Sequence, residues 1–134
     1  MKQILIISIV LLFAAFSALA QVKVNEKRLD SAPQAFRTFF ASFSRAAAKG
    51  QKAQVANMTR FPLPYGFDAG DEGKMNRTRF IKEFKFMFDE PFEKNPLFSR
   101  GEDGTYTITT DSTAHLNFIK VKGKFMLVAY IVEP

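Results

Sequence analysis

The sequence predicts an α+β fold in which helices precede antiparallel strands. In the first half, phenylalanines recur at intervals of three and four positions, which is the period of a helix with one apolar face. In the last third, apolar and polar residues alternate in segments that are separated by short turns. Two prolines at alternate positions within residues 61–65 interrupt the helical pattern. These observations predict a layer of helices packed against a sheet.

Residues 1–20 have the order of a secretory signal peptide. Lys2 precedes an apolar run over residues 4–20, which ends in small residues before Gln21. The alternative is an uncleaved membrane anchor, but the run is no longer than the roughly 20 residues that span a bilayer. We therefore expect cleavage after Ala20 and a mature protein that does not span the membrane and is periplasmic or extracellular. The chain contains no cysteine, which excludes a lipid-modified cysteine and a disulfide framework.

The remaining chain divides into a lead-in and a domain. Residues 21–30 predict a flexible lead-in, with Val22 and Val24 in a short edge strand. Residues 31–134 predict a single α+β domain. The chain has 16 phenylalanines and no tryptophan, and a phenylalanine-rich core can stabilise a domain of this size without disulfides or metal.

The first helix is expected to begin at Ser31. Ser31 and Gln34 have the spacing of a capping box, with a proline in the first turn. Gly50 is a natural end for this helix. The side chains of one helical stripe are Phe36, Phe39, Phe40, Phe43 and Ala47.

Two further helices are expected before the strands. The first is short and covers residues 51–58, after which the prolines confine residues 61–65 to an extended edge segment. Residues 68–73 predict an exposed turn. Helical spacing returns after Asn76, a capping residue, with an apolar stripe formed by Phe80, Phe84, Met87 and Phe88.

Three strands are expected at residues 106–109, 113–121 and 124–132. Lys122 and Gly123 form a two-residue hairpin turn between the last two. The last strand is apolar on both faces, so it belongs in the middle of the sheet, or has one face on helices and the other on a partner or a pocket.

The net charge of +6 indicates which chemical classes of partner a basic protein could bind. A basic cytosolic chain would point to nucleic acid, but export argues against that partner. Any electrostatic preference is therefore expected for acidic glycans, lipid head groups or envelope polymers. The alternative is a solvated basic surface that only keeps the protein soluble.

The order of these elements resembles the nuclear transport factor 2-like superfamily. Residues 36–43, the small-residue link at residues 53–56 and the Thr-Arg-Phe-Pro-Leu segment at residues 59–63 look like exported bacterial members of that superfamily, many without an assigned activity. The resemblance implies a cone-like α+β roll, with three N-terminal helices packed on a curved antiparallel sheet. It implies no function, because this cone hosts isomerases, dehydratases, epoxide hydrolases, transport factors and binding domains.

Few residues are candidates for catalysis. His115 is the only histidine, and histidine is the residue type whose charge ordinarily changes near neutral pH. Strand spacing places it on the same face as Asn117, so the two could project into the mouth of the cone. The other interpretation is a strand histidine that is exposed to solvent or hydrogen-bonded in place. With one histidine and no cysteine we expect no metal site, and residues 68–73 lack the spacing of a calcium loop.

Aromatic residues are the remaining signal for a ligand. Tyr65, Tyr106 and Tyr130, together with Phe67 and Phe92, are candidates to line a ligand-binding cavity, since a curved sheet leaves a concave pocket. The competing interpretation is that phenylalanines fill that space.

We expect a non-catalytic binding or interaction module of the cell envelope, whose partner is a protein or an envelope component. No cofactor and no nucleic acid are expected. The alternative is a small cone-fold enzyme, similar to an isomerase or a hydrolase, that acts on a hydrophobic small molecule with His115 as acid or base. A homodimer through the sheet is a further prediction, because the last strand is apolar on both faces.

Overall fold

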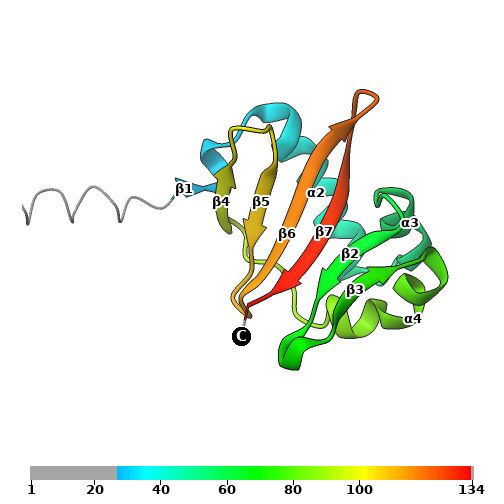
Figure 1. The fold of residues 1–134 in the computed structure, drawn as a ribbon. Helices are drawn as coiled ribbons and strands as arrows, with labels where there is room; N and C mark the ends of the chain where they lie inside the picture. Colours follow the sequence, from blue (N-terminus) through cyan, green and yellow to red (C-terminus); the bar gives the residue numbers. More distant parts are fainter. Residues whose placement is uncertain (1–26, 134) are drawn as a thin grey trace, which may run out of the picture.

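Within the described residues, a mixed seven-stranded sheet forms one layer of the fold, and three α-helices cover one of its faces (Figure 1). The structure is a computed structural model that describes residues 27–133. The predicted signal peptide and the strand proposed around Val22 and Val24 lie outside the described residues. Residues 27–133 contain both helices and strands, and the longest strands follow the helices along the chain, as the two periodicities predict for an α+β fold.

The first α-helix, α2, covers Gln34–Ala48 and begins three residues later than predicted. Ala32 precedes a proline and has an extended backbone, because the proline ring disfavours the helical conformation of the residue before it. The hydroxyl of Ser31 donates to the carbonyl of Arg28 at 2.7 Å instead of capping the helix. The predicted capping box is therefore wrong, and Ser31 ends a short 3₁₀ helix, η1, at Leu29–Ser31.

The other two helices agree with their sequence signals. Gly50 follows α2 with a φ of 69°, which is the conformation expected of a glycine that ends a helix. Helix α3 covers Lys52–Asn57, and α4 covers Arg77–Met87. The side chain of Asn76 accepts a hydrogen bond from the amide of Arg79 at 2.9 Å, so the predicted cap of α4 is confirmed.

The strands follow the order β1-β4-β5-β6-β7-β2-β3 across the sheet. Three strands, β1, β3 and β4, are additional to those predicted. The seven strands are β1 at Lys27–Arg28, β2 at Leu63–Gly66, β3 at Glu72–Met75, β4 at Leu97–Arg100, β5 at Tyr106–Thr109, β6 at Ala114–Val121 and β7 at Lys124–Val132.

The proline-containing strand β2 lies inside the sheet, not at its edge. It pairs in parallel with β7 through Tyr65 and Gly66, and antiparallel with β3 along its full length. The prediction of a purely antiparallel sheet is therefore wrong. Pro64 is tolerated because it precedes the parallel ladder with β7, where a missing amide removes no hydrogen bond.

The hairpin of β6 and β7 forms the centre of the sheet. Lys122 and Gly123 both have positive φ angles, of 52° and 81°, as a tight two-residue hairpin turn requires. A register shift at Asn117 and Phe118 makes Val128 an extra residue in β7, and such a bulge increases the local twist. The position of β7 between β6 and β2 confirms the prediction that the strand with two apolar faces lies inside the sheet.

The core lies between the helices and the inner face of the sheet. Helix α2 contributes three of the expected phenylalanines, and α4 contributes the other apolar stripe. Rings from the two layers contact each other directly, as between Phe43 and Phe118 at 5.2 Å and between Phe36 and Tyr106 at 4.7 Å. Among the fully buried large side chains are Phe36, Phe40, Phe43, Phe80, Leu116, Phe118 and Leu127.

Candidate functional site

A cavity of about 530 Å³ opens at one end of the fold, where α4 meets the ends of several strands. The η2 turn (Asp68–Gly70) and the C-terminal half of α4 form two sides. The segment between α4 and β4 and the turn between β5 and β6 complete the rim, and Leu116 and Val132 reach it from the sheet. This volume is within the range of small-molecule sites.

Aromatic side chains form much of the wall. Phe67 contacts Phe86 and Tyr130, with ring centroids 5.3 Å and 6.0 Å apart. Phe88 lies 6.0 Å from Tyr130 and 6.3 Å from Phe92. Phe86 is 65% exposed, which is unusual for so large an apolar side chain. The cavity therefore offers aromatic surface that the fold itself does not bury.

Tyr130 joins the sheet to the end of α4. Its hydroxyl donates a hydrogen bond to the main-chain carbonyl of Met87 at 2.9 Å, and its side chain is buried. Burial raises the pKa of Tyr130 from 10 to about 12. The residue is therefore neutral at physiological pH and fixes one wall of the cavity.

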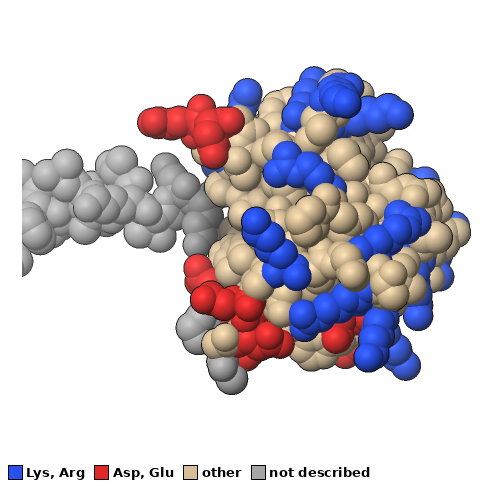
Figure 2. All heavy atoms as spheres, turned by 45° about the vertical axis from the view of Figure 1, so that its right-hand side comes forward, with Lys and Arg blue, Asp and Glu red and all other residues tan. Residues whose placement is uncertain are grey.

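The rim of the cavity is acidic. Seven of the chain's 13 carboxylate side chains line it, and no lysine or arginine among residues 27–133 does. Figure 2 shows one face of the molecule, with acidic side chains at its upper left and lower left and basic side chains over much of the rest. The seven carboxylates are those of Asp68, Asp71, Glu83, Asp89, Glu90, Glu93 and Asp111.

A short polar network orients one side of the rim. Arg79 donates from Nη1 to the hydroxyl of Tyr65 at 2.7 Å, and this hydroxyl donates to Oδ1 of Asp71 at 3.2 Å. The guanidinium carbon also lies 4.6 Å from the centre of the Tyr65 ring. Tyr65 thus positions Asp71 at the rim.

Two carboxyl groups meet on the other side of the rim. The side-chain hydrogen bond between Glu93 and Asp111, and then the negative charge of Asp111, raise the pKa of Glu93 above its ordinary value of 4.5. The charge of Arg28, whose Nη1 lies 3.4 Å from Oε2 of Glu93, opposes this shift. A carboxyl with a raised pKa contributes stability at low pH that is lost as the pH rises through the folded-state pKa.

Replacing Asp111 by asparagine is expected to return the pKa of Glu93 toward its ordinary value. The like charge disappears, so the variant should be more stable than the wild type near neutral pH, with little difference in acid, where both carboxyls are protonated. Carbon-detected NMR titration of the carboxyl groups measures the pKa directly, and urea unfolding at both pH values measures stability. Asp68→Asn is the control, because it removes a rim charge without touching this pair. An unchanged pKa of Glu93 in Asp111→Asn would contradict the assignment.

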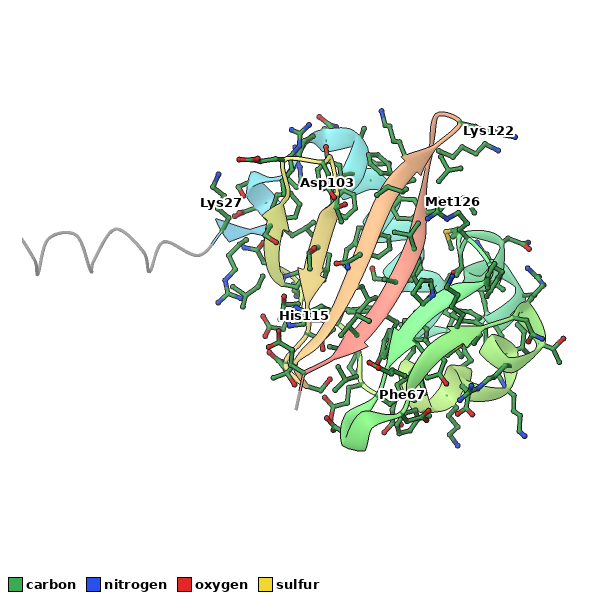
Figure 3. The ribbon with its side chains drawn as sticks, in the orientation of Figure 1. Lys27, Phe67, Asp103, His115, Lys122 and Met126 are labelled. Carbon is green, nitrogen blue, oxygen red and sulfur yellow. The ribbon has the colours of Figure 1, made fainter. Side chains whose placement is uncertain are left out.

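The structure places His115 and Asn117 on the outer face of the sheet, away from the helices (Figure 3). Neither residue lines the cavity, so the geometry does not meet the expectation that they project together into it. Asn117 accepts from the hydroxyl of Thr107 at 2.8 Å. The Nδ1 atom of His115 lies 2.9 Å from Oγ1 of Thr109, its cross-strand neighbour. The catalytic role of these residues stays a prediction.

His115 also contacts the end of the chain. Its Nε2 atom lies 3.1 Å from Oε1 of Glu133, close enough for an ion pair when the ring is protonated. Nε2 makes no hydrogen bond to a described residue. The pairing of β6 with the end of β7 brings the imidazole beside the Glu133 carboxylate.

Of the five aromatic residues that the sequence favours, Phe67, Phe92 and Tyr130 line the cavity. Tyr65 supports the rim from beside it. Tyr106 lies elsewhere in the core, stacked on Phe36 at 4.7 Å. Phe86 lines the cavity but was not among the candidates. Its signal in the sequence is that it lies outside the apolar stripe of α4, where a polar residue would be expected.

A second, more open hollow of about 750 Å³ follows β1 and β4. It begins at Lys27, the first described residue, and Phe98 is the one aromatic residue among those that line it. The aromatic, acid-rimmed cavity is therefore the candidate site.

Two classes of structure are not found in the part of the chain that is described. Among residues 27–133, no three histidine or carboxylate side chains converge closely enough to hold a metal ion. No helix in the same residues is sufficiently long and apolar to cross a bilayer.

Comparisons with known proteins show a shared fold. The sequence matches no family model and no curated protein. Aln2 from a Streptomyces species is similar in structure, with a TM-score of 0.51 and 12% identity, over 74% of this chain and 87% of that one. A calcium/calmodulin dependent protein kinase II association domain from Xanthomonas campestris also has a TM-score of 0.51, with 15% identity over 83% of this chain and 96% of that one. At such low identity, the likeness establishes an α+β fold in common and nothing about activity.

Proposed function

We propose that this chain is a non-catalytic binding domain of an exported protein, and that the apolar part of its ligand occupies the acid-rimmed cavity. The observation that carries the proposal is the aromatic wall, with Phe86 left largely exposed beside a cavity of ligand size. Among residues 27–133, the charged groups that line this cavity are carboxylates, and neither His115 nor a lysine is one of the lining residues. The aromatic wall favours recognition, and acid–base chemistry at this cavity would have to use carboxyl groups such as those of Glu93 and Asp111.

We further propose that the chain belongs to the nuclear transport factor 2-like superfamily. Three helices on one face of a sheet that is bent by a bulge fit the cone-like roll of that superfamily. The two solved structures with the same overall fold support this assignment. Because the cone hosts many activities, the function is argued from the cavity alone.

Export and self-association belong to the same proposal. The apolar leader ending at Ala20 supports a periplasmic or extracellular location, where the partner is a protein or an envelope component. Half-buried apolar side chains on the outer face of the sheet, among them Met126, Ala129 and Ile131, support a homodimer through that face.

Phe86→Ser tests the cavity. We expect the neutral fluorescent probe N-phenylnaphthylamine to bind the wild type saturably, and Phe86→Ser to weaken binding by about five- to tenfold, since one aromatic wall is lost. The urea midpoint should barely change, because Phe86 is 65% exposed. Fluorescence titration and urea unfolding measure the two quantities.

Val121→Ser is the matched control for that experiment. It removes a half-buried apolar side chain at the hairpin end of β6, outside the cavity lining, and should leave probe binding unchanged. The proposed function would be contradicted if the probe did not bind the wild type, or if both variants lost the same affinity for it.

The second candidate is an enzyme that uses His115. The contacts of Thr109, His115 and Glu133 place a hydroxyl, an imidazole and a carboxylate in one chain, the groups that many hydrolases combine. Thr109 and His115 are also cross-strand neighbours on an open face, where such polar pairs stabilise sheets without any catalysis. We regard the pairing as structural, and the binding domain as the better supported function.

A further inference from the structure

The rim of the acid-rimmed cavity holds more negative charge than the fold requires. Asp71 has Arg79 at 3.9 Å, and Glu93 has Arg28 at 3.4 Å. The other five rim carboxylates make no ion pair with a residue in the described part of the chain. A chain with a net charge of +6 thus keeps a strongly negative region at one cavity.

Two of these carboxylates lie where they oppose helix stability. Asp89 and Glu90 follow the C-terminal end of α4, which carries the negative end of the helix dipole. Basic residues are the favourable choice at such a position. Acidic residues there add to the negative potential of the cavity at the expense of the fold, which favours a role in binding.

The aromatic wall points to an organic ligand independently of these charges. Phe67 and Phe86 meet edge to face at 5.3 Å, and both line the same cavity as the carboxylates. Aromatic faces attract organic cations, and they bind the apolar body of such a ligand at the same time.

A metal ion fits this arrangement poorly. The carboxylates come from separate segments around the rim, and among residues 27–133 no three of them converge on a point. Charges that are spread around an apolar cavity instead match a ligand whose cationic group lies at the mouth and whose apolar part lies inside.

We propose that the cavity selects organic cations, namely amines or quaternary ammonium compounds with an apolar body. This proposal rests on the proposed function, since it names the chemical class of the ligand for the same cavity. Anionic amphiphiles are disfavoured because the rim would repel them, which gives the site specificity as well as affinity.

Competition between amphiphiles of one chain length tests the charge preference. Purified protein is loaded with N-phenylnaphthylamine, which is then displaced by octyltrimethylammonium, octyl glucoside or octyl sulfate, each below its micelle concentration. We expect the cation to displace the probe at a concentration about tenfold below that of the sulfate at low salt. The ratio of the two displacing concentrations should fall as the ionic strength rises toward about 0.5 M, because salt screens the rim charges.

Asp89→Asn/Glu90→Gln tests the carboxylates themselves. Neither side chain has a described ion-pair partner, so no contact is broken. We expect the affinity for octyltrimethylammonium to fall about three- to tenfold, and the preference for this cation over octyl glucoside to fall with it. The melting temperature should be equal or higher, because two charges leave the negative end of α4.

Glu72→Gln/Glu102→Gln is the matched control. It removes the same number of exposed carboxylates away from the cavity, and we expect less than about a twofold change in cation affinity. Equal competition by sulfate and cation, or an equal loss in both double variants, would overturn the charge preference while leaving the binding cavity standing. Failure of the probe to bind at all would instead overturn the proposed function.

Discussion

Replacing Phe36 by alanine is expected to destabilise the protein by about 3–5 kcal/mol, the cost of truncating a fully buried aromatic side chain. Phe36 is 0% exposed and lies where α2 crosses the sheet. Six aromatic rings surround it, those of Phe39, Phe40, Phe98, Tyr106, Phe118 and Phe125. Domains of this size have about 5–15 kcal/mol of stability in total, so the loss should be obvious in urea unfolding at neutral pH.

Phe86→Ala is the matched control for Phe36→Ala. It makes the same chemical change in a side chain that is 65% exposed, so we expect a change within about 0.5 kcal/mol. Should Phe36→Ala not fold, Phe36→Leu keeps the comparison measurable, at a cost of about 1.5 kcal/mol. Equal costs for the two alanine variants would show that the packing of α2 on the sheet is wrong.

The helical layer could be predicted because its signals are local. Phe36, Phe40 and Phe43 fall on one face at helical spacing, and all three are buried against the sheet. Asn76 caps α4 as expected, since the cap depends on a contact only three residues away. The β6 and β7 hairpin was similarly predictable from Lys122 and Gly123, whose turn fixes the pairing of the flanking strands.

The missed strands lack local signals. β3 buries only Met75, and β1 is two charged residues long. Both are strands because of their partners, β2 and β4, so their pairing is a tertiary effect. The capping box failed for a different reason, since the restriction that Pro33 places on Ala32 outweighs the cap that Ser31 could supply.

The acidic rim of the candidate site could not be predicted from the sequence, because it too depends on tertiary structure. Asp68 and Asp71 lie in one turn and Asp89 follows α4, and an acidic residue at such a place ordinarily indicates only solvent exposure. Net charge predicted a basic surface with a preference for acidic partners, because composition carries no information about where charges gather. Only the fold brings these carboxylates to one rim, around aromatic residues from α4 and the sheet.

Removing the hydroxyl of Tyr130 is expected to have the second large effect. Tyr130→Phe deletes the hydrogen bond to the Met87 carbonyl at the end of α4, and a buried acceptor that loses its donor costs about 1–2 kcal/mol at neutral pH. Urea unfolding near pH 7 measures this cost. Tyr106→Phe is the control, because the Tyr106 hydroxyl makes no hydrogen bond to a described residue.

The pH dependence of the free energy of unfolding tests whether the Tyr130 hydroxyl is buried, which the measurement at neutral pH alone does not. The pKa of Tyr130 is raised to about 12 in the folded state, so its contribution is complete below the unfolded pKa of about 10 and is lost as the pH rises toward 12. This rise of the pKa from 10 to about 12 corresponds to about 3 kcal/mol. Wild type should therefore lose more stability between about pH 10 and 12 than Tyr130→Phe does. The comparison isolates Tyr130, because the other groups that titrate in this range are the same in both proteins.

Stability curves for wild type and Tyr130→Phe should therefore converge as the pH rises. At neutral pH the wild type is more stable by its hydrogen bond, and above about pH 10 that advantage shrinks because the buried phenol must ionise. Parallel curves would mean that the hydroxyl is in contact with water, and hence that this wall of the cavity is open. Because the same ring lines the candidate site, convergence supports a dry apolar wall of the kind that a hydrophobic ligand needs.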